Sequence, residues 1–298
     1  MAFARRPVSE WRLRSRSLAV GTRTLIMGVL NVTPDSFSDG GLYVEAEAAA
    51  ERALAMLDEG ADLIDIGGES TRPGQIAMSV SAEEEQDRVL PVIETVLHTR
   101  PEAVLSVDTW KAETARAAVD AGAEIVNDIS GFTWDAAMAE TCAAVACGVA
   151  LMHTRGRPPE WRTQPRLESA AVLPLVRDGL AHSLDLAQSA GIARERIVLD
   201  PGYGFGKAFE DNYPLFAHQD ELLALGRPVL AGVSRKSFLG RTAGGARGGA
   251  DLPVGERGAA TVAATTAAIL AGASIVRVHD VRPAVDAAAI ADAILAAL

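Results

Sequence analysis

Cysteine is nearly absent: the 298 residues include only Cys142 and Cys147. Their CxxxxC spacing matches no common zinc or redox motif, and no His or Cys pair lies nearby to complete a metal site. We therefore expect both thiols to be buried as small hydrophobic side chains of a helix. So few cysteines also agree with a reducing compartment.

Aromatic residues and positive charge are scarce as well. Aromatic residues make up 5% of a chain that is 49% hydrophobic, so a large core must be built from Ala, Val, Ile and Leu. The 28 Lys and Arg residues stand against 39 Asp and Glu, a formal net charge of −11. A general nucleic-acid-binding protein needs a basic face to displace counterions, so we expect no nucleic-acid partner.

A convincing membrane-spanning run is also lacking. The N-terminus MAFARRPVSEWRLRSRS has five arginines and no apolar segment of signal-peptide length. The stretch 259–276 is uncharged for about the length of a membrane span, but it contains Thr and Ser and is interrupted by Gly272. A buried Ala-rich helix followed by a strand explains it better. We expect a cytoplasmic protein with no membrane partner.

What recurs instead is a short apolar run rich in Val, Ile and Leu. Eight such runs occupy residues 24–31, 61–68, 104–109, 124–130, 148–154, 196–202, 228–234 and 274–280. Strands buried on both faces have such near-continuous apolar sequences. Segments with helical spacing, such as 45–59 and 109–121, lie between them. The alternation predicts an α/β fold, a (β/α)8 TIM barrel, in a single domain of residues 1–298 whose core begins near residue 22.

The alternative architecture is an open doubly wound sheet. That fold usually has a Gly-rich dinucleotide-binding turn after its first strand, and none occurs there. The segment WRLRSRSLAVGTRT alternates polar and apolar residues around Val20-Gly21, which predicts a small N-terminal hairpin at the bottom of the barrel. The segment 240–258 contains seven glycines and is expected to be a disordered or mobile loop. Gly60, Gly122 and Gly272 are expected to end helices in the left-handed conformation.

Polar residues stand at the end of every apolar run. A strand-terminal Asp or Asn is often only the N-cap of the following helix. Caps do not explain why carboxylates and a lysine follow apolar strands that all end at one barrel mouth, where TIM-barrel active sites lie. In chain order these residues are Asn31, Glu69, Asp108, Asn127, His153, Asp200, Ser234, Lys236, Arg277 and His279.

The residue types at the mouth suggest a ligand. Asp108, Asn127 and Asp200 offer carboxylate and amide groups suited to a flat heterocycle with N–H and NH2 donors. Lys236 suits a ring carbonyl or a ring nitrogen. The loop DPGYGFGK (200–207) matches neither a Walker loop nor GxGxxG, and its glycines would let the backbone approach a planar ligand near Phe205.

A local positive cluster would also suit an anion. Arg277 and His279 are two residues apart on one strand, so they point the same way. With Asn31 and Arg72 they would form an anion-binding pocket in an otherwise acidic protein.

Eight motifs together resemble those of the dihydropteroate synthase family, in order and with one motif per strand end. They are NVTPDSFSDGG (31–41), DIGGESTRPG (65–74), SVDTWKAE (106–113), VNDISG (126–131), LMH (151–153), LDPGYGFGK (199–207), SRKSFLG (234–240) and RVHDV (277–281). The resemblance implies a transferase of folate biosynthesis. In that reaction 6-hydroxymethyl-7,8-dihydropterin pyrophosphate loses pyrophosphate and p-aminobenzoate attacks the exposed methylene, giving 7,8-dihydropteroate.

The resemblance also implies roles for individual residues. It places the pterin against Asp108, Asn127, Asp200, Lys236 and Arg277, the pyrophosphate at Asn31, Arg277 and His279 with Mg2+ near Asn31, and p-aminobenzoate against Thr71, Arg72, Pro73, Phe205 and Ser234. We expect Asp35, Asp108 and Lys236 to be the catalytic residues, with Asp35 in the first loop. Members of the family are commonly homodimers, so the resemblance implies a homodimer.

Two other functions share part of this pattern. A pterin-binding methyltransferase barrel would also present an Asp/Asn edge to the pterin, but it has no reason to carry Ser70–Pro73 and Ser234–Ser237. A non-catalytic paralogue that binds pterin is the other alternative, and the intact set of charged strand-end residues argues against it.

Overall fold

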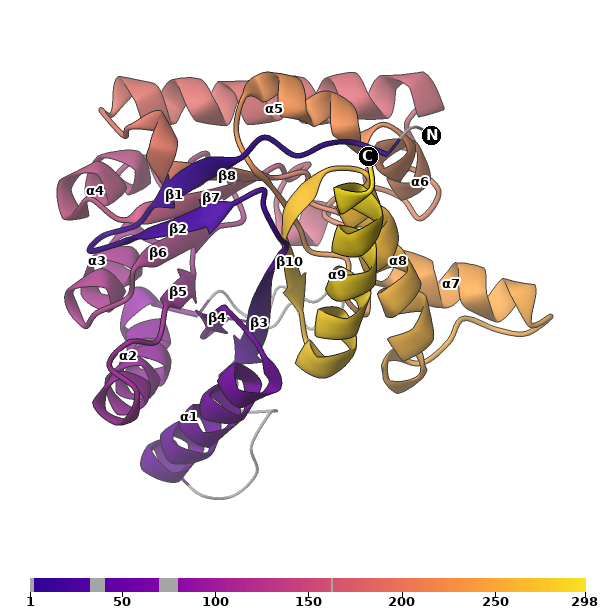
Figure 1. The fold of residues 1–298 in the computed structure, drawn as a ribbon. Coiled ribbons are helices and arrows are strands. Elements are labelled where there is room, and N and C mark those ends of the chain that lie inside the picture. The colour runs from indigo at the N-terminus through magenta and orange to yellow at the C-terminus, as the bar shows by residue number, and fades with distance from the viewer. Residues whose placement is uncertain (1–2, 33–40, 70–79, 162) are drawn as a thin grey trace.

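The computed structural model describes residues 3–32, 41–69, 80–161 and 163–298. Eight parallel strands form a closed barrel in the order β10-β3-β4-β5-β6-β7-β8-β9 (Figure 1). They are β3 Leu25–Asn31, β4 Leu63–Gly67, β5 Leu105–Asp108, β6 Ile125–Asp128, β7 Gly148–Met152, β8 Ile197–Asp200, β9 Val229–Ala231 and β10 Ala273–Val278. Each strand coincides with one predicted apolar run, which confirms the TIM barrel.

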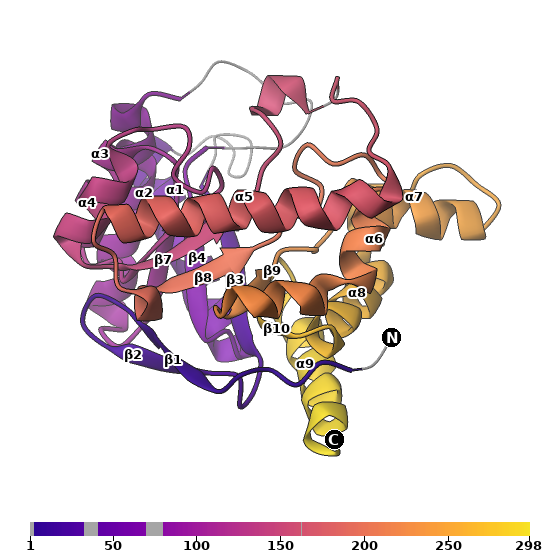
Figure 2. The same cartoon turned by 90° about the horizontal axis from the view of Figure 1, so that it is seen from above.

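Helices surround the barrel in Figures 1 and 2. They are α1 Gly41–Glu59, α2 Ala82–Thr99, α3 Ala112–Asp120, α4 Met138–Val145, α5 Ser169–Ser189, α6 Asn212–Ala217, α7 Ser237–Ala246, α8 Gly258–Leu270 and α9 Val281–Ala296, with 3-10 turns η2 Pro158–Glu160, η3 Arg194–Arg196, η4 Gln219–Leu225 and η5 Val254–Glu256. Gly60, Gly122 and Gly272 have φ values of 110°, 117° and 98°, so these three predicted helix stops are confirmed.

Strand residues alternate between the two faces of the barrel wall, as the period of a strand requires. Outward side chains such as Ile64 and Ile66 join the large cluster that packs against the helices. Inward side chains such as Leu25, Met27 and Leu63 form a separate cluster inside the barrel. Continuing the same alternation toward the strand ends turns polar residues inward, above this apolar floor.

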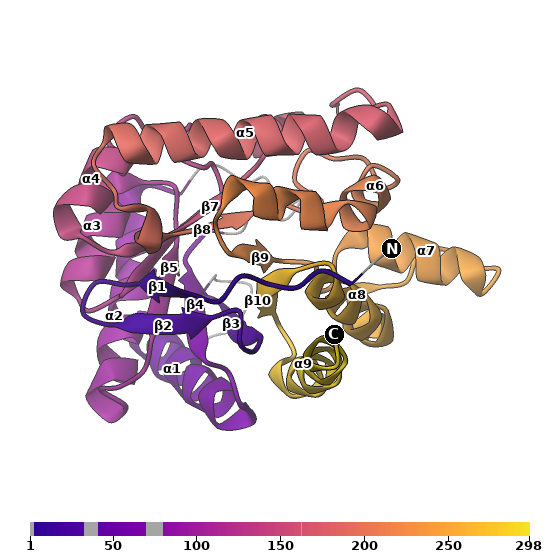
Figure 3. The same cartoon turned by 45° about the horizontal axis from the view of Figure 1, so that its top comes forward.

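The N-terminal hairpin closes the other end of the barrel, where the strands begin (Figure 3). Its strands β1 Ser9–Arg12 and β2 Ser17–Val20 pair antiparallel, and Trp11 belongs to the interior cluster. The indole Nε1 of Trp11 donates to Arg196 O at 2.9 Å, just before β8. The predicted hairpin is confirmed, and its turn lies at Leu13–Arg16, where Leu13 N donates to Arg16 O.

The prediction of a loop over residues 240–258 is wrong for its first part, because residues 240–246 belong to α7. Gly240 is buried in this helix, and a Cβ there would lie 2.9 Å from Leu252 O and 2.5 Å from Arg257 Nε. Glycine content therefore reflects close packing against the returning chain at this position, not disorder.

Two further expectations concern buried helical segments. The uncharged stretch 259–276 is α8 followed by β10, as predicted, and within the described ranges no helix is long and apolar enough to cross a membrane. Cys142 and Cys147 are both free and buried. Cys142 lies in α4, whereas Cys147 lies after that helix, just before β7.

Candidate active site

Four neighbouring strands bring three of the predicted residues to one level at the barrel mouth. The strand register pairs Asn31 with Gly67, Gly67 with Asp108, and Asp108 with Asn127. Gly67 has no side chain, and a Cβ there would lie 3.4 Å from Asp108 Cβ. The glycine therefore keeps space open between Asn31 and Asp108.

Arg277 connects strands that are not neighbours in the barrel. From β10 its Nε donates to Asp65 Oδ2 and its Nη2 donates to Asp108 Oδ2, both at 2.6 Å. The same Asp65 oxygen accepts a bond from Asn127 Nδ2 at 2.9 Å. One network thus joins β4, β5, β6 and β10 through side chains that are buried, at Asp65 and Asn127, or partly buried, at Asp108 and Arg277.

Asp65 is a site residue that the sequence reasoning missed. It is completely buried on β4. A signal was available, because the strand LIDIG places Asp65 at the same inward parity as Leu63. A charged residue at an inward position of an apolar strand needs a buried partner, and here the partner is Arg277.

Charges at the mouth shift the pKa of Asp108 and Arg277. Burial raises the pKa of Asp108 to about 7; Arg277 opposes this shift, whereas Asp65 adds to it. Burial would lower the pKa of Arg277, but Asp65 and Asp108 outweigh it and hold that pKa above its ordinary value. The guanidinium therefore stays charged, and Asp108 is poised to exchange a proton near neutral pH.

Asp200 and Lys236 lie on the adjoining side of the mouth. Burial raises the pKa of Asp200 to about 6, against a bond that its Oδ1 accepts from Gly202 N at 2.7 Å. Burial lowers the pKa of Lys236 to about 7, and Arg277 lowers it further. A Cβ on Gly232, between them in the sequence, would lie 3.5 Å from Asp200 Oδ2 and 3.9 Å from Arg277 Cβ.

The loop after β8 folds back on the mouth and places Phe205 there. Lys236 Nζ lies 3.8 Å from the centre of the Phe205 ring, and Trp161 packs edge-on against that ring at 5.0 Å. Lys207, which the sequence reasoning also passed over, donates from Nζ to Gly202 O at 2.8 Å and to Phe205 O at 3.3 Å. Its ammonium thus holds the loop backbone in place.

Ser234 and His279 meet where β9 and β10 lead into their loops. The hydroxyl Oγ of Ser234 lies 3.0 Å from His279 Nδ1 and accepts a bond from His279 N at 3.2 Å. Arg235, which follows Ser234, adopts the left-handed conformation at φ 58°. Its guanidinium binds Asp280, which follows His279, through two nitrogens. The structure therefore brings Ser234 and His279 together.

Nine of the predicted site residues fall in the described part of the chain: Asn31, Asp108, Asn127, Asp200, Phe205, Ser234, Lys236, Arg277 and His279. Asp35, Thr71, Arg72 and Pro73 lie outside the described residues. In the ranges that the structure describes, no group of three or more His, Cys, Asp or Glu side chains is arranged to hold a metal ion.

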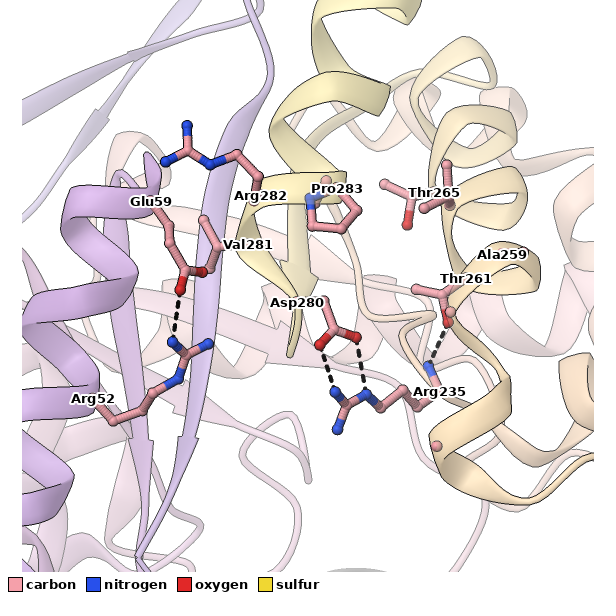
Figure 4. Close-up of a pocket in the computed structure, with 14 residues that line it drawn as sticks. Arg52, Glu59, Arg235, Ala259, Thr261, Thr265, Asp280, Val281, Arg282 and Pro283 are labelled. Carbon is pink, nitrogen blue, oxygen red and sulfur yellow. Dashed lines mark hydrogen bonds and ion pairs between the residues drawn. The ribbon is translucent and has the colours of Figure 1, made fainter.

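A groove of about 560 Å³ lies outside the barrel, lined by residues of α1, α8 and α9 (Figure 4). Two ion pairs occupy part of its wall, Arg52 with Glu59 at 2.7 Å and Arg235 with Asp280 at 2.5 Å. None of the predicted site residues lines it. The candidate active site is therefore the mouth of the barrel.

Comparison with known proteins agrees with this geometry. The model of the pterin-binding enzyme family matches residues 27–279. The dihydropteroate synthase of Bacillus subtilis is 44% identical over 280 residues, which cover 94% of this chain and 91% of that protein.

Two solved structures of the dihydropteroate synthase of Xanthomonas albilineans have the same fold. The one with 4-aminobenzoic acid has a TM-score of 0.86 and 41% identity, and it covers 97% of this chain and 99% of its own. The one with 7,8-dihydropteroate has a TM-score of 0.83 and 39% identity, with the same coverage. The chain therefore belongs to the pterin-binding enzyme family and, by similarity over nearly its whole length, to the dihydropteroate synthases within it.

Proposed function

We propose that the mouth of this barrel condenses 6-hydroxymethyl-7,8-dihydropterin pyrophosphate with p-aminobenzoate to give 7,8-dihydropteroate and pyrophosphate. The protein is a transferase of folate biosynthesis. The observation that supports this assignment best is the partly buried network in which Arg277 binds both Asp65 and Asp108. It places carboxylate and amide acceptors beside a fixed cation at one mouth.

The pterin would lie between these acceptors and Lys236. Its pyrimidine ring carries N–H and NH2 donors, which match the side chains of Asp108, Asn127 and Asp200. Lys236, when protonated, would donate to a ring carbonyl or ring nitrogen from the adjoining side. Arg277 would lie against the ring face with its guanidinium fixed by two carboxylates.

The pyrophosphate would leave toward Asn31, Arg277 and His279. Negative charge develops on the leaving oxygens, so fixed cations there lower the barrier. Asn31 offers an amide oxygen, the hard type of donor that suits Mg2+, which typically keeps water ligands and shares substrate phosphate oxygens. This donor set fits an ion held mainly through the pyrophosphate, where Mg2+ would supply charge neutralisation.

Positioning and electrostatics would carry the rest of the reaction. Loss of pyrophosphate leaves a cationic pterin methylene. Asp108 is a carboxylate at the barrel mouth, where it would stabilise this cation. Asp35, outside the described residues, is proposed for the same role. The aniline nitrogen of p-aminobenzoate is already nucleophilic, so no activating base is needed. Phe205 and Ser234, with Thr71, Arg72 and Pro73, are proposed to bind this second substrate.

Turnover tests this proposal directly. The purified protein, given both substrates and Mg2+, should release pyrophosphate and form dihydropteroate in equal amounts. A sulfonamide should compete with p-aminobenzoate, because it presents a similar para-amino ring. Absence of both products under these conditions would rule the assignment out, and methyl transfer from a methylated folate would favour the methyltransferase alternative.

We also propose that the enzyme acts in the cytoplasm as a homodimer. The dimer proposal follows from the family alone. Five side chains of α8 are already buried within the chain: Thr261, Ala264, Thr265, Ala268 and Ile269. A dimer interface would therefore have to use other residues. Light scattering of the purified protein measures the mass in solution.

A further inference from the structure

We propose that Asp65 is a positioning residue that sets the hydrogen-bonding polarity of the pterin pocket, and hence its preference for a ring edge that carries N–H donors. The inference rests on the proposed function and deepens it. Asp65 lies one inward position below Gly67, which is level with Asp108 across the strand register. It therefore acts from beneath the residues proposed to touch the pterin.

A single oxygen of Asp65 holds two pocket side chains. Its Oδ2 accepts from Arg277 Nε at 2.6 Å and from Asn127 Nδ2 at 2.9 Å. The donors come from β10 and β6, which flank β4 on opposite sides around the barrel. All three side chains are inside the wall, where Asp65 and Asn127 are buried and shielded from competing water.

The contact with Asp65 decides which way the amide of Asn127 faces. The oxygen and nitrogen ends of an amide have nearly the same shape, so the surrounding hydrogen bonds determine the orientation. A carboxylate paired with a guanidinium can only accept, so Asn127 must turn Nδ2 toward Asp65. Its Oδ1 is then directed away from Asp65 and remains an acceptor for a ligand donor.

Arg277 is constrained by the same carboxylate. Its Nε is bound to Asp65 and its Nη2 to Asp108, so these two donors are not offered to the ligand edge. The pocket wall made by Asp108, Asn127 and Asp200 therefore presents acceptors. A ligand with acceptors along that edge would leave buried lone pairs facing one another, which is the kind of mismatch that gives strong discrimination.

A purely structural role explains Asp65 poorly. Its other oxygen, Oδ1, is buried and finds no hydrogen-bond partner among the described residues. An unsatisfied buried acceptor costs free energy, and apolar residues of similar shape often replace buried ion pairs without loss of stability. The carboxylate is better explained by what it does to Asn127 and Arg277.

The test compares two Asp65 variants with two ligands. Asp65→Leu keeps the approximate shape and removes the acceptor, whereas Asp65→Asn keeps an oxygen that can still accept from Asn127. The ligands are 6-hydroxymethylpterin and its 2-oxo counterpart, in which an acceptor replaces the 2-amino donor. Calorimetry gives the ratio of the two dissociation constants for each protein.

We expect Asp65→Leu to lower the preference for the 2-amino ligand by at least about ten-fold, since the Asn127 amide is no longer held in one orientation. Asp65→Asn should bind both ligands more weakly but restore most of the preference. A folded Asp65→Leu protein with an unchanged ratio would overturn the proposal.

Asp128→Asn is the matched control. Asp128 is also a fully buried carboxylate, but in the described part of the chain it accepts from the backbone N–H groups of Ser130 and Phe132 and not from the pocket side chains. Asp128→Asn should lower the free energy of unfolding but leave the ratio of the two dissociation constants unchanged. Wild-type turnover and pterin binding are measured in parallel, so failure of the proposed function is seen separately from failure of this inference.

A measurement on the wild-type protein covers the case in which Asp65→Leu does not fold. Asparagine occurs only at positions 31, 127 and 212, so selective isotope labelling gives few side-chain amide signals, and Asn127→Asp identifies one of them. The Asn127 amide protons should exchange slowly and show no nuclear Overhauser contact to bound pterin. Such a contact would show that Nδ2 faces the ligand, and the proposal would fall.

Discussion

Burial moves the pKa values of three ionisable residues at the mouth toward neutrality: about 7 for Asp108, about 6 for Asp200 and about 7 for Lys236. Burial removes the water that would otherwise bond these groups. A ligand that supplies a hydrogen-bond donor or acceptor therefore restores the lost interaction. The buried mouth thus favours a ligand with polar groups on both sides of its ring.

Replacing Lys236 by Met should weaken pterin binding. The change removes the ammonium that lies over Phe205 at the mouth while keeping most of the side-chain volume. A hydrogen bond from a charged donor contributes about 1.5–3 kcal/mol, so affinity should fall roughly ten- to hundred-fold. Calorimetry with 6-hydroxymethylpterin measures this, with Arg247→Met on the exposed end of α7 as a control; equal affinities would refute the assignment.

Pterin binding should also depend on pH on both sides of neutrality. The raised pKa values of Asp108 and Asp200 mean that their carboxylates are lost as pH falls through about 7 and about 6, so acceptors disappear on the acid side. The lowered pKa of Lys236 means that its charge is lost as pH rises through about 7, which removes a donor on the alkaline side. Affinity should peak near neutral pH, and the alkaline limb should vanish in Lys236→Met. A profile identical in the two proteins would contradict this explanation.

At the scale of elements, backbone packing places the functional side chains. The loop after β8 is held by Lys207, whose Nζ donates to carbonyls of Gly202, Phe205 and His153. Burial lowers the pKa of Lys207 to about 7, because placing the charged ammonium among these carbonyls costs desolvation free energy. In return the loop sets Phe205 against Lys236.

Glycines in α7 give a second prediction at this scale. Gly240→Ala would bring a Cβ close to Leu252 O and Arg257 Nε, so the helix must shift or the contact must break. We expect a loss of about 1–3 kcal/mol in the free energy of unfolding. Gly245→Ala in the same helix meets no atom within 4 Å and should be neutral or stabilising. Urea denaturation compares them, and equal effects would show that the close approach is unimportant.

At the scale of the whole molecule, the two ends of the barrel do different work. The N-terminal hairpin and the apolar interior cluster close the bottom, whereas the charged network occupies the mouth. Apolar packing at the bottom and charged side chains at the mouth separate stability from chemistry, as TIM barrels generally do.

Trp11→Ala tests that separation. The indole is completely buried in the interior cluster, and truncating a buried Trp typically costs about 3–5 kcal/mol. Because Trp11 lies at the opposite end from the mouth, KM for both substrates should stay unchanged in the folded fraction. Thermal denaturation and steady-state kinetics give the two quantities; a large change in KM without loss of stability would contradict the division.

Much of the fold follows from local patterns in the sequence. Eight apolar runs separated by helical segments predict the barrel because strands buried on both faces cannot tolerate alternating polar residues. The strand-end residues Asp108, Asn127, Asp200 and Arg277 follow from the same pattern, since parallel strands of a barrel end at one mouth. The prediction of a mobile segment over 240–258 failed for residues 240–246, because glycine content alone does not distinguish a flexible loop from a helix packed closely against the chain.

The sequence by itself therefore determined the architecture, the family and most of the residues at the mouth. Only the tertiary structure decided the contacts of Asp65 and Lys207. The contacts of Asp65 join strands that are far apart along the chain, β4, β6 and β10, and they exist only when the barrel closes. Lys207 likewise binds backbone carbonyls of two loops, including His153 O. Local sequence determines which side chains are available, but a hydrogen bond needs its donor and acceptor within about 3 Å of each other, and folding alone sets that distance.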